Sequence, residues 1–230
     1  MAAEAHSTAT LRLTVGDLRI VHPITVPSGS VAAADVIPAL QGLVNAVVEA
    51  AETGKQISCR KGCGACCRQL VPVSRTEGER LLTLIEAMPK ERRTALHARF
   101  AVAEAALEGA GLAERGAKTD REMSLAYFAL RLPCPFLEEE SCSIHPERPL
   151  VCREYLVTSP ADLCAGPAQE GVTPVAVPKV SMAARSLQDD GEDWFPLAGL
   201  MAWARTRPRK SVRRTGPEWV QRFLKGIGRK

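Results

Sequence analysis

We expect the 230-residue sequence to contain no segment that directs it to a membrane or out of the cell. No apolar run approaches the roughly 20 residues that a membrane-spanning helix needs. The first residues, MAAEAHSTATLRLTV, do not join a basic region to an apolar core as a secretory signal does. Basic and acidic side chains are nearly balanced, at 30 against 26. We therefore expect a cytoplasmic protein without a membrane partner.

Familiar catalytic motifs are missing as well. The sequence contains no Ser-His-Asp arrangement, no phosphate-binding loop and no zinc-protease helix. His6, His22 and His97 lie far in the sequence from every cysteine, so a cysteine-histidine hydrolase is unsupported. These absences leave open whether the protein is an enzyme.

What the sequence has is cysteine, in two groups. A cytoplasmic compartment disfavours disulfides, and eight cysteines in 230 residues fall well below the roughly 8 to 10% of a disulfide scaffold. Metal binding, catalysis or burial remain, and the local density favours a metal, because zinc and iron both accept thiolates. The first group is Cys59, Cys63, Cys66 and Cys67, and the second is Cys134, Cys142, Cys152 and Cys164.

The layout of the two groups predicts one composite metal site. Ligands on two segments that a helical spacer separates come together only on folding. Gly62 and Gly64 flank Cys63 and let the backbone wrap around a metal. Nearby cations would offset the charge of about −2 that four thiolates leave around a divalent ion, and with a helix N-terminus near Cys152 they should lower thiol pKa values. These cations are Arg60, Lys61, Arg68, Arg131, Arg148 and Arg153.

Cys66 and Cys67 are adjacent, so their side chains diverge and do not serve one ion symmetrically. Three alternatives remain: one thiol faces a second site, one is a small buried hydrophobe, or a multinuclear centre takes both. Eight thiols suffice for two four-cysteine sites, or for one site with reactive thiols beside it. The thiol count, the adjacent pair and the many cations favour iron slightly over zinc, with an iron-sulfur centre as one form.

Two known cysteine patterns fit poorly. The spacing of Cys59, Cys63 and Cys66 is that of radical S-adenosylmethionine enzymes, but no run of repeating strands and helices follows it. A zinc ribbon needs two Cys-x2-Cys pairs, and Cys63 with Cys66 is the only such pair in the sequence.

Sequence patterns predict an α+β fold that is mainly α: a compact cysteine-cluster metal-binding domain with a helical hairpin as spacer and short β-hairpins. Residues 11–26 alternate apolar and polar side chains about a Gly-Asp turn, which predicts a hairpin with one buried face. Asp35 can cap a helix that tolerates Pro38 in its first turn and ends at Gly54.

A helical spacer is expected between the cysteine groups. Ser74 and Thr76 each stand three residues before a glutamate, a capping-box pattern that opens a helix. Pro89 begins a second helix that continues to Gly109, and a further helix is expected over 121–130.

The second cysteine group should lie on short elements. Residues 134–145 predict a small hairpin, and Pro149 suits the first position of a helix that carries Cys152. Further short helices are expected over 181–188, 197–205 and 217–225. We divide the chain into an N-terminal hairpin and helix (1–54), a cysteine-cluster metal-binding domain (55–168), and a basic, mostly helical extension packed on the same unit (169–230).

The cysteine segments together resemble a known family. CRKGCGACC, CPFLEEESCSIHPERPLVCREY and the later Cys164 resemble the YkgJ-type cysteine-cluster family over about residues 55–168. The resemblance implies zinc or iron chelation by the eight cysteines, each of which falls on a family cysteine. Many relatives have Tyr where this chain has His145, whose imidazole could be a ligand, although a histidine in a polar turn is more often solvated. Flagellin lysine methylases carry a similar cluster, so a metal-dependent redox or group-transfer, protein-modifying enzyme is the alternative by analogy.

A basic stretch precedes the amphipathic C-terminal helix. A solvated basic face, with Trp219 and Phe223 packed on the core, is favoured over nucleic-acid contact because the overall charge is only +4. The stretch comprises Arg205, Arg207, Arg209, Lys210, Arg213 and Arg214.

Overall fold

The fold is known from a computed structural model, in which helices hold 52% of the structure and small sheets 17%. The α+β, mainly α prediction is thereby confirmed. The structure describes residues 5–113, 116, 118–166, 171–188, 194–207 and 212–227.

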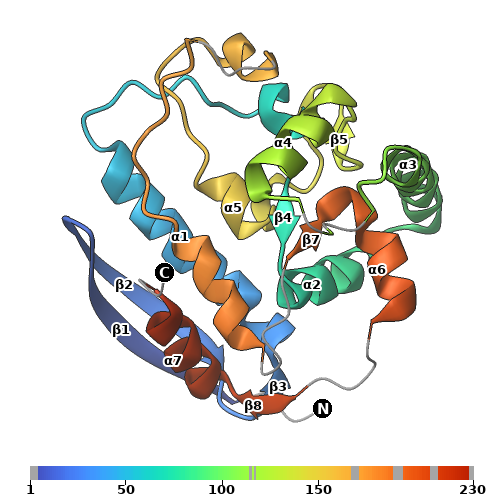
Figure 1. The fold of residues 1–230 in the computed structure, drawn as a ribbon. Coiled ribbons are helices and arrows are strands. Elements are labelled where there is room, and N and C mark those ends of the chain that lie inside the picture. The colour runs from blue at the N-terminus through green and yellow to red at the C-terminus, as the bar shows by residue number, and fades with distance from the viewer. Residues whose placement is uncertain are drawn as a thin grey trace.

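The strands pair into two-stranded antiparallel sheets (Figure 1). They are β1 (His6–Val15), β2 (Leu18–Pro27), β3 (Ser30–Ala32), β4 (Pro72–Val73), β5 (Leu137–Glu138), β6 (Ser141–Cys142), β7 (Phe195–Pro196) and β8 (Arg213–Thr215). The α-helices are α1 (Ile37–Glu52), α2 (Arg75–Glu86), α3 (Lys90–Gly109), α4 (Asp120–Ala129), α5 (Leu150–Arg153), α6 (Leu200–Thr206) and α7 (Gly216–Gly226). Short 3-10 turns are η1 (Ala33–Val36), η2 (Ala65–Arg68), η3 (His145–Glu147), η4 (Ala161–Ala165), η5 (Val180–Leu187) and η6 (Leu197–Gly199).

The predicted N-terminal hairpin is confirmed and is longer than expected. β1 and β2 pair from His6 with Pro27 to Val15 with Leu18. Alternate residues of β2, such as Ile20 and Ile24, are buried against α1, while their neighbours face water. The hairpin therefore covers one side of the central helix.

The helix α1 begins after a 3-10 turn rather than at the expected cap. The Asp35 carboxylate accepts a hydrogen bond from the Ala32 backbone N–H at 2.9 Å, so it caps η1, and α1 starts at Ile37 with Pro38 in its first turn. One apolar face of α1 is buried, with Leu40 among its residues. The expected helix is confirmed, and its predicted cap is wrong.

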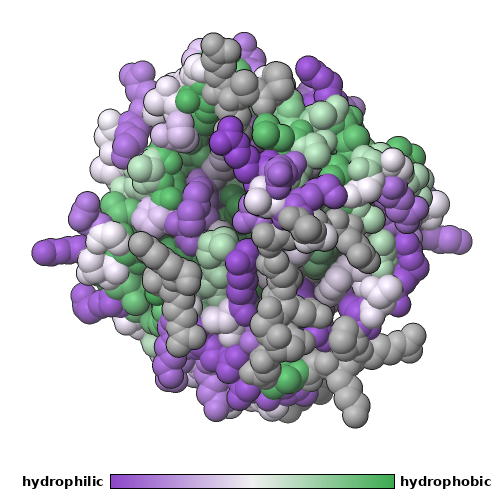
Figure 2. Space-filling view, in the orientation of Figure 1, coloured by the Kyte–Doolittle hydropathy of each residue, from purple (hydrophilic) through white to green (hydrophobic). Residues whose placement is uncertain are grey.

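One helical stretch, Ala33–Glu52, is long and apolar enough by length and composition to cross a membrane. We had expected no such segment, because single polar residues interrupt the apolar run. In the structure 56% of its apolar window is buried inside the protein, as in the core helix of a folded domain. Hydrophilic residues are spread among apolar ones over the face shown in Figure 2.

The C-terminal segment returns to the N-terminal one. β8 pairs with β3, and α7 packs on β2 and η5 (Figure 1). Trp219 of α7 is buried and donates its indole N–H to the Val31 carbonyl at 3.0 Å. The hairpin, α1, η5 and α7 thus enclose one apolar core, which we call the α1 core. The division at 54 and 168 stays a prediction, and the residues around 168 lie outside the described part.

A second apolar cluster is built by the spacer helices. Leu81 of α2, Phe100 of α3 and Leu200 of α6 pack together with Phe136, whose ring meets Phe100 edge-on. The capping box at Ser74 is formed, because its hydroxyl accepts from the Glu77 N–H and the Glu77 carboxylate accepts from the Ser74 N–H. The helical spacer between the two cysteine groups is confirmed, and α4 is a further helix of this spacer.

Candidate metal centre

The first cysteine group lies on a tight turn followed by η2. The Cys63 N–H donates to the Arg60 carbonyl at 3.0 Å, and Gly62 between them has a φ of +87°, which a residue with a side chain rarely adopts. Cys66 and Cys67 then sit within η2, where the Cys67 N–H donates to the Gly64 carbonyl. The predicted wrapping of the backbone around this group is therefore built by local turns.

This turn packs directly on the β5–β6 hairpin. A side chain at Gly64 would come within 2.7 Å of the Leu137 side chain and 2.9 Å of the Glu140 carbonyl, so only glycine fits there. Beside it, Arg68 forms a two-pronged ion pair with the Glu140 carboxylate, at 2.9 and 2.6 Å. The expected cation Arg68 is thus paired with a carboxylate.

Backbone and side-chain hydrogen bonds join the two cysteine groups. The Cys134 N–H donates to the Cys67 carbonyl at 2.7 Å. The Gln69 amide donates to the Cys164 carbonyl at 3.1 Å. These contacts bring segments that are about 70 to 95 residues apart into fixed register.

The second group occupies the short elements that the sequence predicted. Cys142 lies in β6 of the small hairpin, Cys152 in α5 and Cys164 in η4. Pro149 precedes α5 as its N-cap instead of filling the first helical position. The buried Glu77 carboxylate accepts from the Leu150 N–H at 2.9 Å and so ties the start of α5 to the start of α2.

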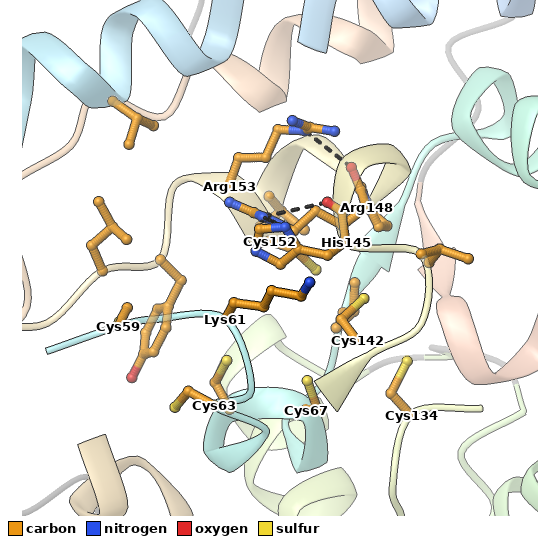
Figure 3. Close-up of a pocket in the computed structure, with 18 of the residues that line it drawn as sticks. Cys59, Lys61, Cys63, Cys67, Cys134, Cys142, His145, Arg148, Cys152 and Arg153 are labelled. Atoms are coloured by element: carbon orange, nitrogen blue, oxygen red, sulfur yellow. Dashed lines mark hydrogen bonds between the residues drawn. The ribbon is translucent and has the colours of Figure 1, made fainter. Parts of the chain in front are cut away.

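A cavity of 760 Å³ opens between these segments and α1. Figure 3 shows cysteines of both groups around it. Tyr155 also lines the cavity, and its hydroxyl donates a hydrogen bond to the Cys164 sulfur at 3.9 Å. Cys164 itself is buried behind Tyr155 and does not line the cavity. The cysteines that line the cavity are Cys59, Cys63, Cys66, Cys67, Cys134, Cys142 and Cys152.

Cys66 interacts electrostatically with cysteines of both groups. A negative charge on its sulfur raises the pKa of cysteines from both groups, so their thiols are close enough to influence one another. The side chain of Cys67 also hydrogen-bonds to Cys66, which is the largest cause of the raised Cys66 pKa. The cysteines whose pKa responds to Cys66 are Cys59, Cys134, Cys142, Cys152 and Cys164.

The thiols hold their protons more tightly than the sequence predicted. Burial raises the pKa of Cys134 to about 12 and that of Cys152 well above its ordinary value. We had expected the neighbouring cations and the helix N-terminus to lower the Cys152 pKa. That prediction is wrong, because α5 has only four residues, and desolvation followed by the negative charges of neighbouring thiolates and of Glu77 raises the Cys152 pKa. A metal ion must displace these protons when it binds.

The donor chemistry fits zinc or iron, while the arrangement is more open than a closed site. No three His, Cys, Asp or Glu side chains in the described ranges, which include all eight cysteines, group closely enough to hold one ion. Ligation needs sulfur at about 2.3 Å from zinc. The thiols therefore have to draw inward around a metal.

Four of the six predicted cations surround the cavity. Arg60, Lys61, Arg148 and Arg153 line it, whereas Arg68 pairs with a carboxylate and Arg131 does not line it. His145 lines the cavity too, and its ring contacts the Arg148 guanidinium. Burial and then the charge of Arg148 lower the His145 pKa. Its role as a ligand stays a prediction.

The wall of the cavity that α1 forms was not predicted from the sequence. Asn45, Glu49 and Glu52 of α1 line it, on the side of the helix away from the buried stripe. Their spacing of four and three residues along an otherwise apolar helix was the signal that could have found them. Asn45 accepts a hydrogen bond from Arg153 at 2.9 Å, which links α1 to α5.

Comparison with known proteins gives one match. No curated protein and no solved structure matches the chain. Residues 58–170 match the CxxCxxCC family, described as "Putative zinc- or iron-chelating domain". The match spans both cysteine groups and agrees with the predicted range of 55–168 within three residues. Over residues 58–170, just under half of its length, the chain is therefore similar to the CxxCxxCC family.

Proposed function

We propose that the protein chelates zinc or iron in the cysteine-lined cavity, with ligands from both cysteine groups. The observation that carries this proposal is that seven of the eight cysteines, from segments far apart in the sequence, line one cavity. All eight are free thiols in the structure, so none is used up in a disulfide. Soft thiolate ligands suit zinc and iron.

Within this function we propose iron over zinc, in a centre that takes more than four thiols. The support is the number of thiols at the cavity and the central place of the Cys66–Cys67 pair between the two groups. Arg60 and Arg153 on the same walls offset the charge that thiolates retain around a metal. An iron-sulfur cluster is another form of the iron site, and four of the thiols would hold it.

Anaerobic purification followed by elemental analysis and a visible spectrum tests the proposal. We expect stoichiometric iron, and for an iron-sulfur centre a visible absorption band that dithionite bleaches. Colourless protein with stoichiometric zinc would retain chelation and reject the iron-sulfur centre, because zinc has no redox chemistry. Protein without zinc or iron would contradict the proposed function.

A metal-dependent redox or group-transfer enzyme is the second candidate. The observation in its favour is the size of the cavity, since 760 Å³ lies within the range of about 300 to 1,000 Å³ that is usual for ligand pockets. A structural metal alone needs no such space. Saturable binding of a small molecule to the metal-loaded protein would support this candidate, and a cavity that binds none would count against it.

We also propose a cytoplasmic protein without a nucleic-acid partner. In the described part of the basic stretch, side chains have partners within the chain: Arg205 pairs with Glu104 at 3.0 Å, Arg213 donates to a backbone carbonyl, and Arg207 lies over the Trp203 ring. Arg209 and Lys210 lie outside the described residues. Binding to mixed oligonucleotides that weakens steeply with salt would contradict this view.

A further inference from the structure

Two cations at the cavity come from different segments and face the same space. Lys61 stands in the first cysteine turn, between Cys59 and Cys63, and Arg148 stands just before α5. Both line the cavity, and Figure 3 shows the Lys61 side chain extending toward His145 and Arg148. Folding therefore brings two positive groups, 87 positions apart in the sequence, together beside the thiols.

These two cations keep hydrogen-bond donors unused. Lys61 makes no hydrogen bond or ion pair within the described ranges. Arg148 uses one guanidinium nitrogen, Nη1, on the His145 ring and the His145 carbonyl. Its Nε and Nη2 groups have no hydrogen-bond partner among the described residues. A guanidinium with free donors matches the geometry of an oxyanion.

Three arginines that lie near the cavity without lining it are paired with carboxylates. Arg68 pairs with Glu140, and Arg99 pairs with Glu138 at 2.5 Å. The carboxylate next to Arg148 in the sequence, Glu147, is taken by an ion pair with Arg80 at 2.9 Å. The nearest carboxylates outside the cavity are therefore already used, and Lys61 and Arg148 have no carboxylate partner among the described residues.

Like charges meet at the His145 ring. The Arg148 guanidinium contacts the ring, the Lys61 side chain extends toward both (Figure 3), and Arg153 lines the same cavity. Arg153 is buried, and its donors are used on Asn45 and on the Arg148 and Pro146 carbonyls. The carboxylates of the cavity, Glu49 and Glu52, come from the α1 wall and form no ion pair with Lys61 or Arg148. An anion placed between Lys61 and Arg148 would relieve this repulsion.

We propose that Lys61 and Arg148 bind an oxyanion, the carboxylate or phosphate group of a small molecule, in the cavity next to the cysteine centre. The volume of 760 Å³ leaves room for a molecule of substrate size. The inference extends the proposed function, because it places the anion beside the thiol-lined side of the cavity that the metal would occupy. The two cations are part of the cavity wall and do not depend on a bound metal.

A competing role for these cations is to offset the thiolates alone. Arg148 does lower the pKa of Cys59, Cys66 and Cys142, so part of its charge acts on the thiols. Under that role, removal of either cation lowers metal affinity and no anion binds. Under the oxyanion role, removal lowers anion affinity and leaves the metal in place.

Calorimetric titration of the full-length, anaerobically purified protein separates these roles. The probes are inorganic phosphate and succinate at constant ionic strength, with metal content measured on the same samples. The variants are Lys61→Met and Arg148→Gln, and the matched control is Arg12→Gln on the exposed side of the hairpin. We expect saturable binding to the wild type and the control, and at least about tenfold weaker binding to each cavity variant with unchanged metal content. Tighter binding of phosphate identifies a phosphate-bearing ligand, and tighter binding of succinate a carboxylate.

Three results would overturn the oxyanion site: no saturable binding of either probe to metal-loaded wild type, binding that both cavity variants retain, or variants that lose metal in place of anion affinity. Wild-type protein that binds the probes through Lys61 and Arg148 but holds no zinc or iron would reject the proposed function and keep this site. Circular dichroism of each variant confirms that it is folded.

Discussion

The α1 core and the cysteine cavity are built in different ways. The α1 core uses long regular elements: two ten-residue strands, a 16-residue helix and the 11-residue α7. Around the cavity, β5 and β6 have two residues each, and η2 and α5 have four. Burial of apolar side chains therefore stabilises the α1 core, whereas individual polar contacts hold together the segments around the cavity.

The two regions therefore contribute differently to stability and to metal binding. The α1 core supplies the free energy that keeps the chain folded, because its side chains are removed from water in one large cluster. Among the cysteine segments, α5 is joined to α1 by the hydrogen bond from Arg153 to Asn45 and to α2 by the hydrogen bond from Leu150 to Glu77. A bound metal would add stability to the cavity region, where short elements cannot supply it.

The largest effect on stability is expected in the α1 core. Phe223 of α7 is fully buried, so Phe223→Ala should lower the free energy of unfolding by about 3 to 5 kcal/mol. Urea unfolding measures this loss, with Val21→Ala at a position 61% exposed as the control. A loss below about 1 kcal/mol would show that stability does not reside mainly in this core.

A buried carboxylate beside α5 should make stability depend on pH. Burial raises the pKa of Glu154 from 4.5 to about 7, although its carboxylate accepts two hydrogen bonds from Ser181. Between these values the folded state binds more protons than the unfolded state, so its stability falls as pH rises from about 4.5 to about 7. The expected fall is about 3 kcal/mol, which Glu154→Gln should remove.

Urea unfolding at several pH values, with chelator present so that metal loss does not contribute, measures the Glu154 effect. Wild type and Glu154→Gln are compared at each pH. If the variant keeps the same pH dependence as the wild type, another group is responsible and Glu154 does not hold its proton in the folded state.

Metal removal should loosen the cavity region and spare the α1 core. We expect a chelator to speed amide hydrogen exchange in η2 and α5 by tenfold or more, on the order that ligand linkage gives. Amides in the centre of α1 should exchange as before, because their protection comes from apolar packing. Equal loss of protection in both regions would show that they unfold as one unit and would remove the distinction between them.

The smallest effect is expected at the exposed ion pair of the cavity region. Arg68 and Glu140 are well matched in geometry but partly open to water, so Arg68→Gln should leave the unfolding midpoint and metal content unchanged. Thermal unfolding and elemental analysis check this. A large drop in metal content would show that this ion pair positions the Cys66–Cys67 turn.

Local patterns predicted most of the elements. The hairpin, α1 and the capped start of α2 follow from alternation, an apolar stripe and the Ser74 box, each contained within a few neighbouring residues. The pairing of β3 with β8 could not be predicted in this way, because Ser30 meets Thr215 across nearly the whole chain. Nothing within either short segment specifies its partner.

The sequence predicted which cysteines form the site better than it predicted their pKa values and hydrogen-bond partners. Sequence order and the family resemblance named the cysteines, and seven line one cavity, with Cys164 behind Tyr155. The direction of the Cys152 pKa shift was not predictable, because it depends on burial between segments and on negative groups that are distant in the sequence. The partner of Arg68 was missed for the same reason, since Glu140 is 72 residues away.

The central claim is that both cysteine groups serve one metal centre. Elemental analysis of anaerobically purified Cys59→Ser and Cys152→Ser, each beside the wild type, tests it most directly. One shared centre predicts that both variants lose zinc or iron to a similar extent, because each removes a thiol from the same cavity. Loss of metal in only one variant, with wild-type content in the other, would contradict the claim.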